Sequence, residues 1–257
     1  MKVDLNSDLG ESWGDFTKGN DGDVLKIVTS ANVACGYHAG DPGVMHKTVS
    51  LATENGVSIG AHPSFMDLQG FGRRRIIGDT PAELERQIAY QIGALQGVAA
   101  MSNSKVTHVK SHGSLGNIAA EDDEIANVIA KAVKSVDPNL IMVVMPGLAT
   151  ERAAIRMGLR MAREIYADRS YQDDGNLTPR SQPGALLHDG VEAADRVIQM
   201  LDEKAIRAVS GKKIKVEIDT ICVHGDNPAA VAMATQIRDA IIDNGYELVP
   251  FKEIVGK

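Results

Sequence analysis

The sequence has few of the features that mark disulfide-rich, membrane-spanning or nucleic-acid-binding proteins. Its 257 residues include two cysteines, Cys35 and Cys222. Two are too few for a disulfide framework or a four-cysteine zinc site, so we expect reduced thiols. The longest hydrophobic runs, such as LIMVVM at 140–145, are far too short to cross a bilayer. We therefore expect no association with a membrane.

The charge also excludes some partners. The net charge is -7 and the chain has no long block of Lys and Arg, which argues against nucleic acid as a partner. The first residues, MKVDLNSDLGE, lack the apolar segment of a signal peptide, so we expect a cytoplasmic protein.

The pattern of hydrophobic residues predicts alternating strands and helices, which is typical of repeated βα units around a parallel sheet. We expect one domain over 1–257, folded as a (β/α) barrel, with an open doubly wound sheet as the alternative. The expected strands are 3–7, 30–35, 57–62, 107–112, 140–145, 162–168, 220–225 and 247–251. The expected helices are 21–28, 42–55, 80–101, 121–136, 148–157, 190–209 and 227–244. Two connections, 63–79 and 169–189, are longer than a barrel requires, and such loops tend to be functional.

Alternation within the strands separates an apolar face from a polar face, because side chains two apart share a face. In the first strand Val3 and Leu5 alternate with Asp4, Asn6 and Asp8. Four other strands behave in the same way. Their polar or inward sets are Gly60 and His62; His108, Lys110 and His112; Glu164, Tyr166 and Asp168; and Cys222, His224 and Asp226.

The apolar faces suit packing against helices, so the polar faces should point into the barrel. Buried charges are costly unless they are paired or belong to a site, and barrel active sites lie at the carboxyl ends of the strands. The side chains expected to converge there are Asp8, His62, Lys110, His112, Asp168 and His224. The alternative is a solvent-facing open sheet or isolated hydrogen-bonded core residues.

Single motifs suggest particular chemistry. Asp8 and Glu11 could act as acid and base, or could be a turn residue and a solvated carboxylate. Histidines beside a carboxylate could bind a divalent metal, with Asp8, His62 and His112 as candidates. Lys110 could neutralise an anionic substrate; the alternative is an ion pair with Asp4 inside the barrel.

Arginines in the two long loops suggest an acidic ligand. Arg73, Arg74 and Arg75 follow Gly72, and guanidinium groups suit carboxylates or phosphates. The alternative is that these arginines are solvated. In the later loop, recognition of an acidic ligand is suggested by Asp168, Arg169, Tyr171 and Arg180.

The segment ACGYHAGDP has a C-x-x-H spacing that resembles half of a metal site. Parity places Cys35 on the helix-packed face with Val33, so we expect it to be a small buried hydrophobic residue. Gly36 then ends the strand, and His38 is expected to turn toward the barrel mouth.

Several blocks together resemble the LamB/YcsF family, the family of 5-oxoprolinase A subunits. The blocks are VDLNSDLGESWG, ANVACGYHAGDP, IGAHPSFMDLQGFGRR, VKSHGSLGN, EIYADRSYQDDGNLTPR and ICVHGDNP. One block departs from the family pattern, which is closer to KPHGALYN. Ser111, Ser114 and Gly116 differ, whereas Lys110 and His112 are retained together with Asn117. The departures affect expected contacts near Gly116 rather than the charged residues.

The resemblance implies a seven-stranded barrel related to the glycoside hydrolase and deacetylase superfamily. It implies ATP-dependent opening of the lactam 5-oxo-L-proline to L-glutamate together with 5-oxoprolinase subunits B and C. The chain has no G-x-x-x-x-G-K-[ST] loop, which indicates that ATP is used largely on the partner subunits.

On this hypothesis, Asp8 or Glu11 and His62 manage protons and water, while Lys110, His112 and His224 stabilise negative charge. The residues expected to bind substrate are Asn6, His38, Arg73, Arg74, Asp168, Arg180, His224 and Asp226.

Two other functions remain open from the sequence. The first is a metal-dependent deacetylase or amidohydrolase that uses the candidate metal ligands. The second is a non-catalytic sugar- or acid-binding subunit.

Overall fold

A computed structural model describes residues 1–255 of the chain and contains a closed parallel barrel, as expected. Seven strands follow one another around the ring, and pairing of the first strand with the last closes it. They are β1 (Lys2–Leu9), β2 (Ser30–Ala34), β3 (Ser58–His62), β4 (Val106–Val109), β5 (Ile141–Val144), β6 (Arg160–Tyr166) and β9 (Thr220–Val223). The short strand β10 (Glu247–Leu248) pairs with the start of β1.

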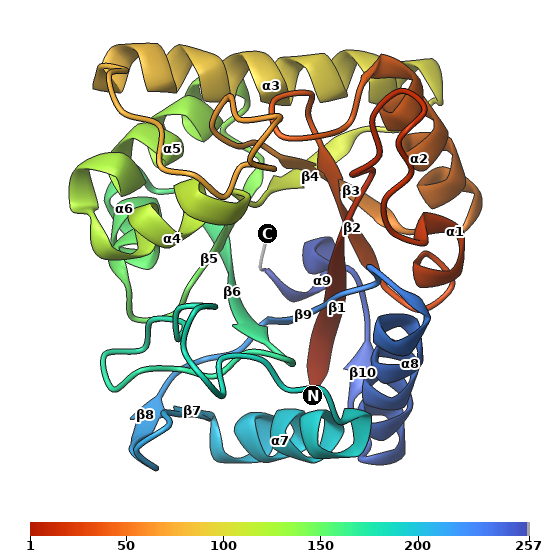
Figure 1. The fold of residues 1–257 in the computed structure, drawn as a ribbon, viewed down its shortest axis with the longest axis vertical. Coiled ribbons are helices and arrows are strands. Elements are labelled where there is room, and N and C mark those ends of the chain that lie inside the picture. The colour runs from red at the N-terminus through yellow and green to blue at the C-terminus, as the bar shows by residue number, and fades with distance from the viewer. Residues whose placement is uncertain (256–257) are drawn as a thin grey trace.

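Helices surround the strands, and Figure 1 looks approximately along the barrel. The main ones are α2 (Pro42–Glu54), α3 (Pro81–Met101), α5 (Asp123–Val136), α6 (Ala149–Met157), α7 (Gly190–Glu203) and α8 (Pro228–Asp243). Shorter helices are α1 (Asp21–Val24), α4 (Gly113–Glu121) and α9 (Phe251–Ile254). Local sequence fixes several helix starts: Thr80 and Glu83 form a reciprocal capping box, with Pro81 in the first turn.

The expected helix over 190–209 is wrong at its C-terminal end. The helix ends at Glu203, and Lys204 adopts a left-handed conformation with φ 48°. The chain then forms β7 (Ala205–Arg207), which pairs antiparallel with β8 (Lys213–Lys215). Hairpin pairing lets Ile206 enter the core, where it is fully buried.

Two other expected boundaries are corrected, and one further helix is present. Helix α1 ends at residue 24 rather than 28, and the expected last strand at 247–251 stops at 248, because Phe251 begins α9. The segment after β4 forms α4, a helix that the sequence did not indicate.

The barrel interior has an apolar floor below a polar upper part. Phe251 of α9 packs against Ile141, Val143 and Ala162, and α9 appears within the ring of strands in Figure 1. The expected parity is confirmed, since Val3 and Leu5 belong to the hydrophobic core around the barrel. The polar side chains buried inside the barrel are Asp4, Asn6, Asn32, His108, Lys110 and Glu164. In the described part of the chain, no helix is long and apolar enough to cross a membrane.

Candidate active site

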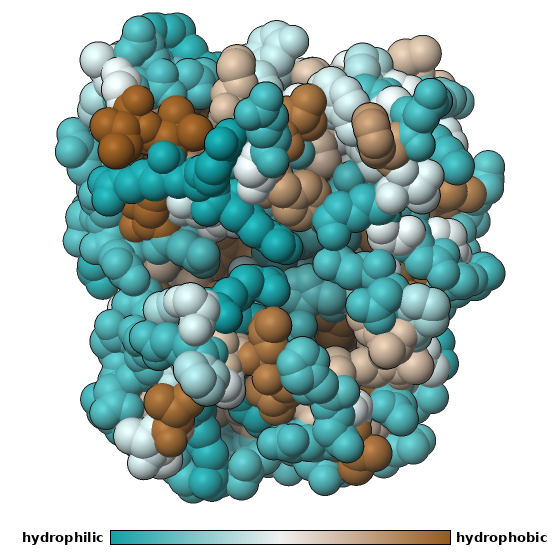
Figure 2. All heavy atoms as spheres, viewed as in Figure 1, coloured by the Kyte–Doolittle hydropathy of each residue, from teal (hydrophilic) through white to brown (hydrophobic). Residues whose placement is uncertain are grey.

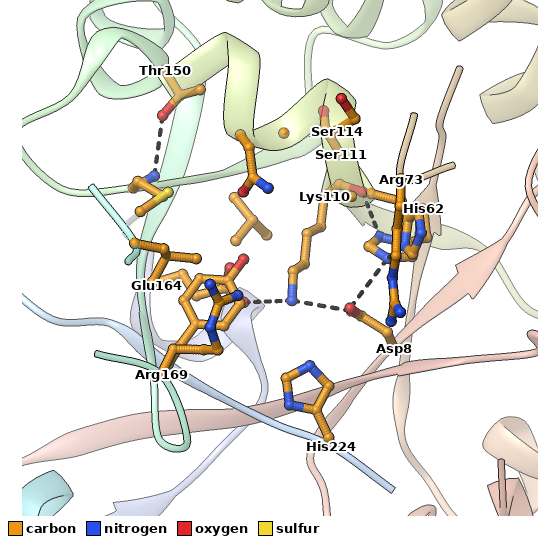
Figure 3. Close-up of a pocket in the computed structure, with 18 of the residues that line it drawn as sticks. Asp8, His62, Arg73, Lys110, Ser111, Ser114, Thr150, Glu164, Arg169 and His224 are labelled. Carbon is orange, nitrogen blue, oxygen red and sulfur yellow. Dashed lines mark hydrogen bonds and ion pairs between the residues drawn. The ribbon is translucent and has the colours of Figure 1, made fainter. Parts of the chain in front are cut away.

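A cavity of about 460 Å³ lies where the strands end. The space-filling view along the barrel shows a largely hydrophilic face with a hollow near its middle (Figure 2). The close-up in Figure 3 shows Lys110 in the centre of the cavity, between Glu164 and Asp8. The expected site residues that line it are Asp8, Glu11, His62, Arg73, Lys110, His112, Arg180, His224 and Asp226.

Lys110 holds two carboxylates together. Its Nζ atom lies 3.0 Å from Oδ1 of Asp8 and 2.8 Å from Oε1 of Glu164. It also lies 3.3 Å from Oδ1 of Asn6 and 3.1 Å from Sγ of Cys222. Burial opposes the charged form, but these neighbours outweigh it and raise the pKa of Lys110 well above its usual value. Lys110 is therefore an ammonium group whose N–H donors already have acceptors.

The ion pair of Lys110 with Asp4, considered from the sequence, is wrong. Asp4 accepts hydrogen bonds from the hydroxyls of Thr29, Ser30 and Thr220 at 2.6–2.7 Å. Burial raises the pKa of Asp4 to about 7, although the hydroxyl hydrogen bonds lower it. Asp4 is thus a buried carboxyl held by neutral donors beneath the site.

His62 and His112 face each other through ring nitrogens that both carry lone pairs in the neutral state. Nδ1 of His62 lies 2.7 Å from the carbonyl oxygen of Lys110, and Nε2 of His112 lies 2.9 Å from that of Phe71. Because a carbonyl only accepts, both of these ring nitrogens must donate. The remaining nitrogens, Nε2 of His62 and Nδ1 of His112, lie 3.0 Å apart. Each is an acceptor in the neutral ring, so a proton or a cation must lie between them.

Carboxylates surround this histidine pair. Oδ2 of Asp8 lies 3.2 Å from Nε2 of His62, and Oε1 of Glu11 lies 3.4 Å from Nδ1 of His112. Glu11 also reaches Nε2 of His38 at 3.3 Å, and the His38 ring stacks on His112 with centroids 3.7 Å apart. His38 is fully buried behind His112 and does not line the cavity.

The two carboxylates differ in their pKa values. Burial raises the pKa of Glu11. Burial has the same effect on Asp8, but the charges of His62 and Lys110 outweigh it and hold the pKa of Asp8 well below its usual value. Asp8 therefore stays ionised, whereas Glu11 is the carboxylate better suited to exchange a proton.

The same cluster could hold a metal ion. Glu11, His38, His62 and His112 offer ligand atoms that lie within 4.8 Å of one another. Imidazole and carboxylate ligands suit zinc and other divalent transition metals, and the converging lone pairs fit such an ion. Of the candidates from the sequence, His62 and His112 belong to this group, and Asp8 adjoins it through His62.

A second group of potential metal ligands fits an ion poorly. It consists of Asp8, Cys222 and His224. The ammonium of Lys110 lies 3.0 Å from the Asp8 carboxylate and 3.1 Å from the Cys222 sulfur, so a cationic side chain already serves these atoms.

His224 and Asp168 form a dyad at the edge of the cavity. Nδ1 of His224 lies 2.7 Å from Oδ2 of Asp168. Burial opposes the charged imidazole, but Asp168 outweighs it and raises the pKa of His224. His224 lines the cavity, whereas Asp168 lies behind it. This arrangement suits a histidine that donates a proton.

The expected arginines separate into two groups. Arg73 lines the cavity with its guanidinium over the Phe71 ring, at 5.1 Å from the centroid, and Arg180 lines it as well. Arg74 does not line the cavity; it forms an ion pair with Asp67 and its side chain is 59% exposed. Asn6 also stays below the cavity, where it donates to Glu164.

Several cavity residues were not in the expected site. The alternation of side chains along the strand places Glu164 and Tyr166 on an inward face, and it could have identified both as residues of the cavity. Arg169 was expected only as part of its loop. The three residues that depart from the family pattern, Ser111, Ser114 and Gly116, also line the cavity.

Residues 111 and 116 are structurally coupled. A Cβ atom added to Gly116 would lie 2.8 Å from the carbonyl oxygen of Ser111, so a side chain at 116 requires the backbone at 111 to move. The two departures therefore belong together on one wall of the cavity.

The cysteine expectation is confirmed. Cys35 is buried in the hydrophobic core with Val33, and burial raises its pKa to about 12. It is neither a candidate ligand nor a nucleophile.

Comparison with known proteins agrees with this architecture. The chain is 55% identical over 251 residues to the 5-oxoprolinase A subunit from Rhodopseudomonas palustris strain BisB5, covering 98% of this chain and 99% of that protein. It is 43% identical to the crystal structure of a lactam utilization protein from Thermus thermophilus, with a TM-score of 0.92 and coverage of 98% and 100%.

A more distant likeness concerns the fold alone. The polysaccharide deacetylase Bc1974 from Bacillus cereus is 14% identical, with a TM-score of 0.51 and coverage of 97% and 92%. The sequence also matches the model of the LamB/YcsF family over residues 3–256. The resemblance seen in the sequence blocks is thereby confirmed: this chain belongs to the LamB/YcsF family.

Proposed function

We propose that this chain opens the lactam ring of 5-oxo-L-proline to give L-glutamate, as the A subunit of an ATP-dependent 5-oxoprolinase. The observation that carries the proposal is a full-length relationship to a protein of that name, combined with a cavity that holds acid, base and cationic groups. The subunits B and C are the proposed partners, and the cytoplasm is the proposed location.

Ring opening needs water at the lactam carbonyl and a proton on the ring nitrogen. We assign the uptake of the water proton to Glu11, whose pKa is raised by burial and which lies 3.4 Å from His112. His224, held by Asp168, is placed to protonate the departing nitrogen.

Positive charge near the carbonyl oxygen stabilises the tetrahedral centre. A proton held between the facing nitrogens of His62 and His112, which lie 3.0 Å apart, would supply such charge at the cavity wall, against the burial that lowers the pKa of His112. Lys110 has no N–H donor to spare, so we assign it the task of keeping Asp8 ionised and of holding Asp8 and Glu164 in place.

ATP fits this scheme on chemical grounds. A lactam is a stabilised amide, and phosphorylation of its oxygen makes the carbon attackable by water. Loss of the ring nitrogen then leaves an acyl phosphate, and its hydrolysis gives glutamate and phosphate. Because the sequence has no P-loop, we propose that the phosphoryl transfer takes place largely on the partner subunits.

The experiment that tests the function is co-expression of the chain with subunits B and C and measurement of glutamate formed from 5-oxoproline and ATP. Wild-type chain should support turnover, and Glu11→Gln should lose it while remaining folded. Equal activity of Glu11→Gln and wild type would contradict the assigned base. Absence of glutamate in the wild-type complex would contradict the function.

A second candidate function, metal-dependent deacetylation or amide hydrolysis, is favoured by the cluster of Glu11, His38, His62 and His112. A divalent ion held there would act as a Lewis acid and lower the pKa of water. Metal analysis separates the two functions. One tightly bound ion per chain, with deacetylase activity that needs no ATP and is lost on chelation, would favour the second.

A further inference from the structure

Two side chains of lysine or arginine are buried within residues 1–255, and their surroundings differ. Lys110 lies between two carboxylates, Asp8 and Glu164. Arg169 is 5% exposed but forms no ion pair with any carboxylate among these residues. A buried charge without a counter-ion is costly unless a ligand supplies one.

Backbone carbonyls hold the guanidinium of Arg169 without neutralising it. Nη2 donates to the carbonyl of Thr178 at 2.7 Å, and Nε donates to that of Ala185 at 3.4 Å. A guanidinium has five N–H donors, so further donors remain. Burial and the charge of Arg180 lower the pKa of Arg169, and the carboxylate of Asp168 offsets them only in part, so the charge lacks full compensation.

The support of Arg169 is rigid. Nη1 of Arg196 donates to the carbonyl of Arg169 at 2.6 Å, and the backbone of Arg169 forms a bridge with Leu186. The Thr178 amide donates to Ser170 in the same loop. The guanidinium is therefore preorganised rather than free to reach a distant partner.

Arg169 belongs to the cavity wall. Figure 3 shows it beside Glu164, on the side of the cavity opposite His62 and Arg73. It also follows Asp168 directly in the chain, and Asp168 holds His224. Asp168, which holds the proposed proton donor His224, and this unpaired cation thus occupy adjacent positions in the chain.

We propose that Arg169 binds the carboxylate of the substrate and makes the site specific for lactams that carry a carboxylate on the carbon next to the ring nitrogen. This inference rests on the proposed function. In 5-oxoproline the carboxylate and the nitrogen are neighbours; in the site Arg169 and His224 line the same cavity, and Asp168, which holds His224, precedes Arg169 in the chain. Arginine suits a carboxylate because its planar fork can form two parallel hydrogen bonds.

The test compares 5-oxoproline with two neutral relatives, 2-pyrrolidinone and 5-oxoprolinamide, in the assembled complex. Wild type should prefer 5-oxoproline. Arg169→Met should lower kcat/KM for 5-oxoproline by about 10- to 100-fold, the typical effect of one charged hydrogen-bonded contact. It should leave the neutral lactams unchanged, and Arg169→Lys should recover part of the loss.

The matched control is Arg152→Met, because Arg152 is half-exposed and pairs with Asp123 on the outer surface. It should not change the preference. A folded Arg169→Met protein that retains wild-type preference would overturn the inference. So would a wild-type complex that opens the neutral lactams as well as 5-oxoproline, which does not depend on how the variant folds.

Failure of the proposed function can be recognised separately. If the wild-type complex forms no glutamate, calorimetric titration of the chain with 5-oxoproline and 5-oxoprolinamide still tests the subsite. Binding that needs both the carboxylate and Arg169 supports it. Equal binding of the two compounds, or no binding of either, overturns it.

Discussion

Nε2 of His62 lies 3.0 Å from Nδ1 of His112, and a backbone carbonyl accepts a hydrogen bond from the other nitrogen of each ring. These carbonyls fix both tautomers, so the facing nitrogens are both acceptors in the neutral state. The pair is thus built to hold one positive charge, whether a shared proton or a metal ion.

The first prediction concerns this pair. His112→Ala should lower turnover of the assembled complex on the order of 10²- to 10³-fold, the range for loss of one group that stabilises the tetrahedral centre. Circular dichroism checks that the variant is folded. The control is His46→Ala, because His46 is exposed on α2. Wild-type turnover in folded His112→Ala would exclude the pair from the reaction.

The second prediction concerns Lys110. Lys110→Met leaves the buried carboxylate of Glu164 and the partly buried one of Asp8 without their cation, so it should lower the free energy of unfolding by about 3–5 kcal/mol. Adding Glu164→Gln removes one of the two carboxylate charges left without a cation and should recover part of the lost free energy of unfolding. Urea denaturation of four proteins, the wild type, Lys110→Met, Glu164→Gln and the double variant, measures this coupling, and strictly additive effects would contradict it.

The sequence could predict the barrel and much of the site because strand periodicity is strict. A period of two places Asp4, Asn6 and Asp8 on one face, and the buried interior requires that face to be inward. The same rule identified Lys110 and His112. It could not identify their partners, because pairing of Lys110 with Glu164 rather than Asp4 depends on how the strands are staggered.

Residues in loops and short helices were harder to predict. Helix α4 contains Gly113, Ser114 and Gly116, which are poor helix formers, so no local signal indicated it. Arg74 and Arg169 look alike in the sequence as loop arginines. Only the fold shows that Arg74 pairs with Asp67 at the surface, whereas Arg169 is buried on the cavity wall.

The third prediction concerns Asp4, whose pKa burial raises from 3.8 to about 7. Between pH 4 and 7 the folded state therefore holds a proton that the unfolded state has lost, so this group makes the protein less stable as pH rises. Asp4→Asn removes the effect. Its free energy of unfolding relative to wild type should rise with pH across this window, by up to about 1.4 kcal/mol per unit.

Denaturant unfolding of both proteins at several pH values measures this difference. The control is Asp15→Asn, because Asp15 is exposed. A difference between Asp4→Asn and wild type that stays constant with pH would show that Asp4 does not exchange its proton on unfolding in this range.

The last prediction concerns the Asp168–His224 dyad. Asp168 raises the pKa of His224, so the protonated imidazole persists to higher pH than it otherwise would. If His224 donates the proton to the leaving nitrogen, turnover falls as pH rises through its pKa. Asp168→Asn removes the charge that supports the imidazolium, so the alkaline limb of the pH–rate profile should move to lower pH.

Measurement of kcat against pH in the assembled complex checks this shift. A variant whose alkaline limb coincides with that of wild type would assign the proton donor to another group, because the carboxylate lies 2.7 Å from the ring and cannot be removed without changing its pKa.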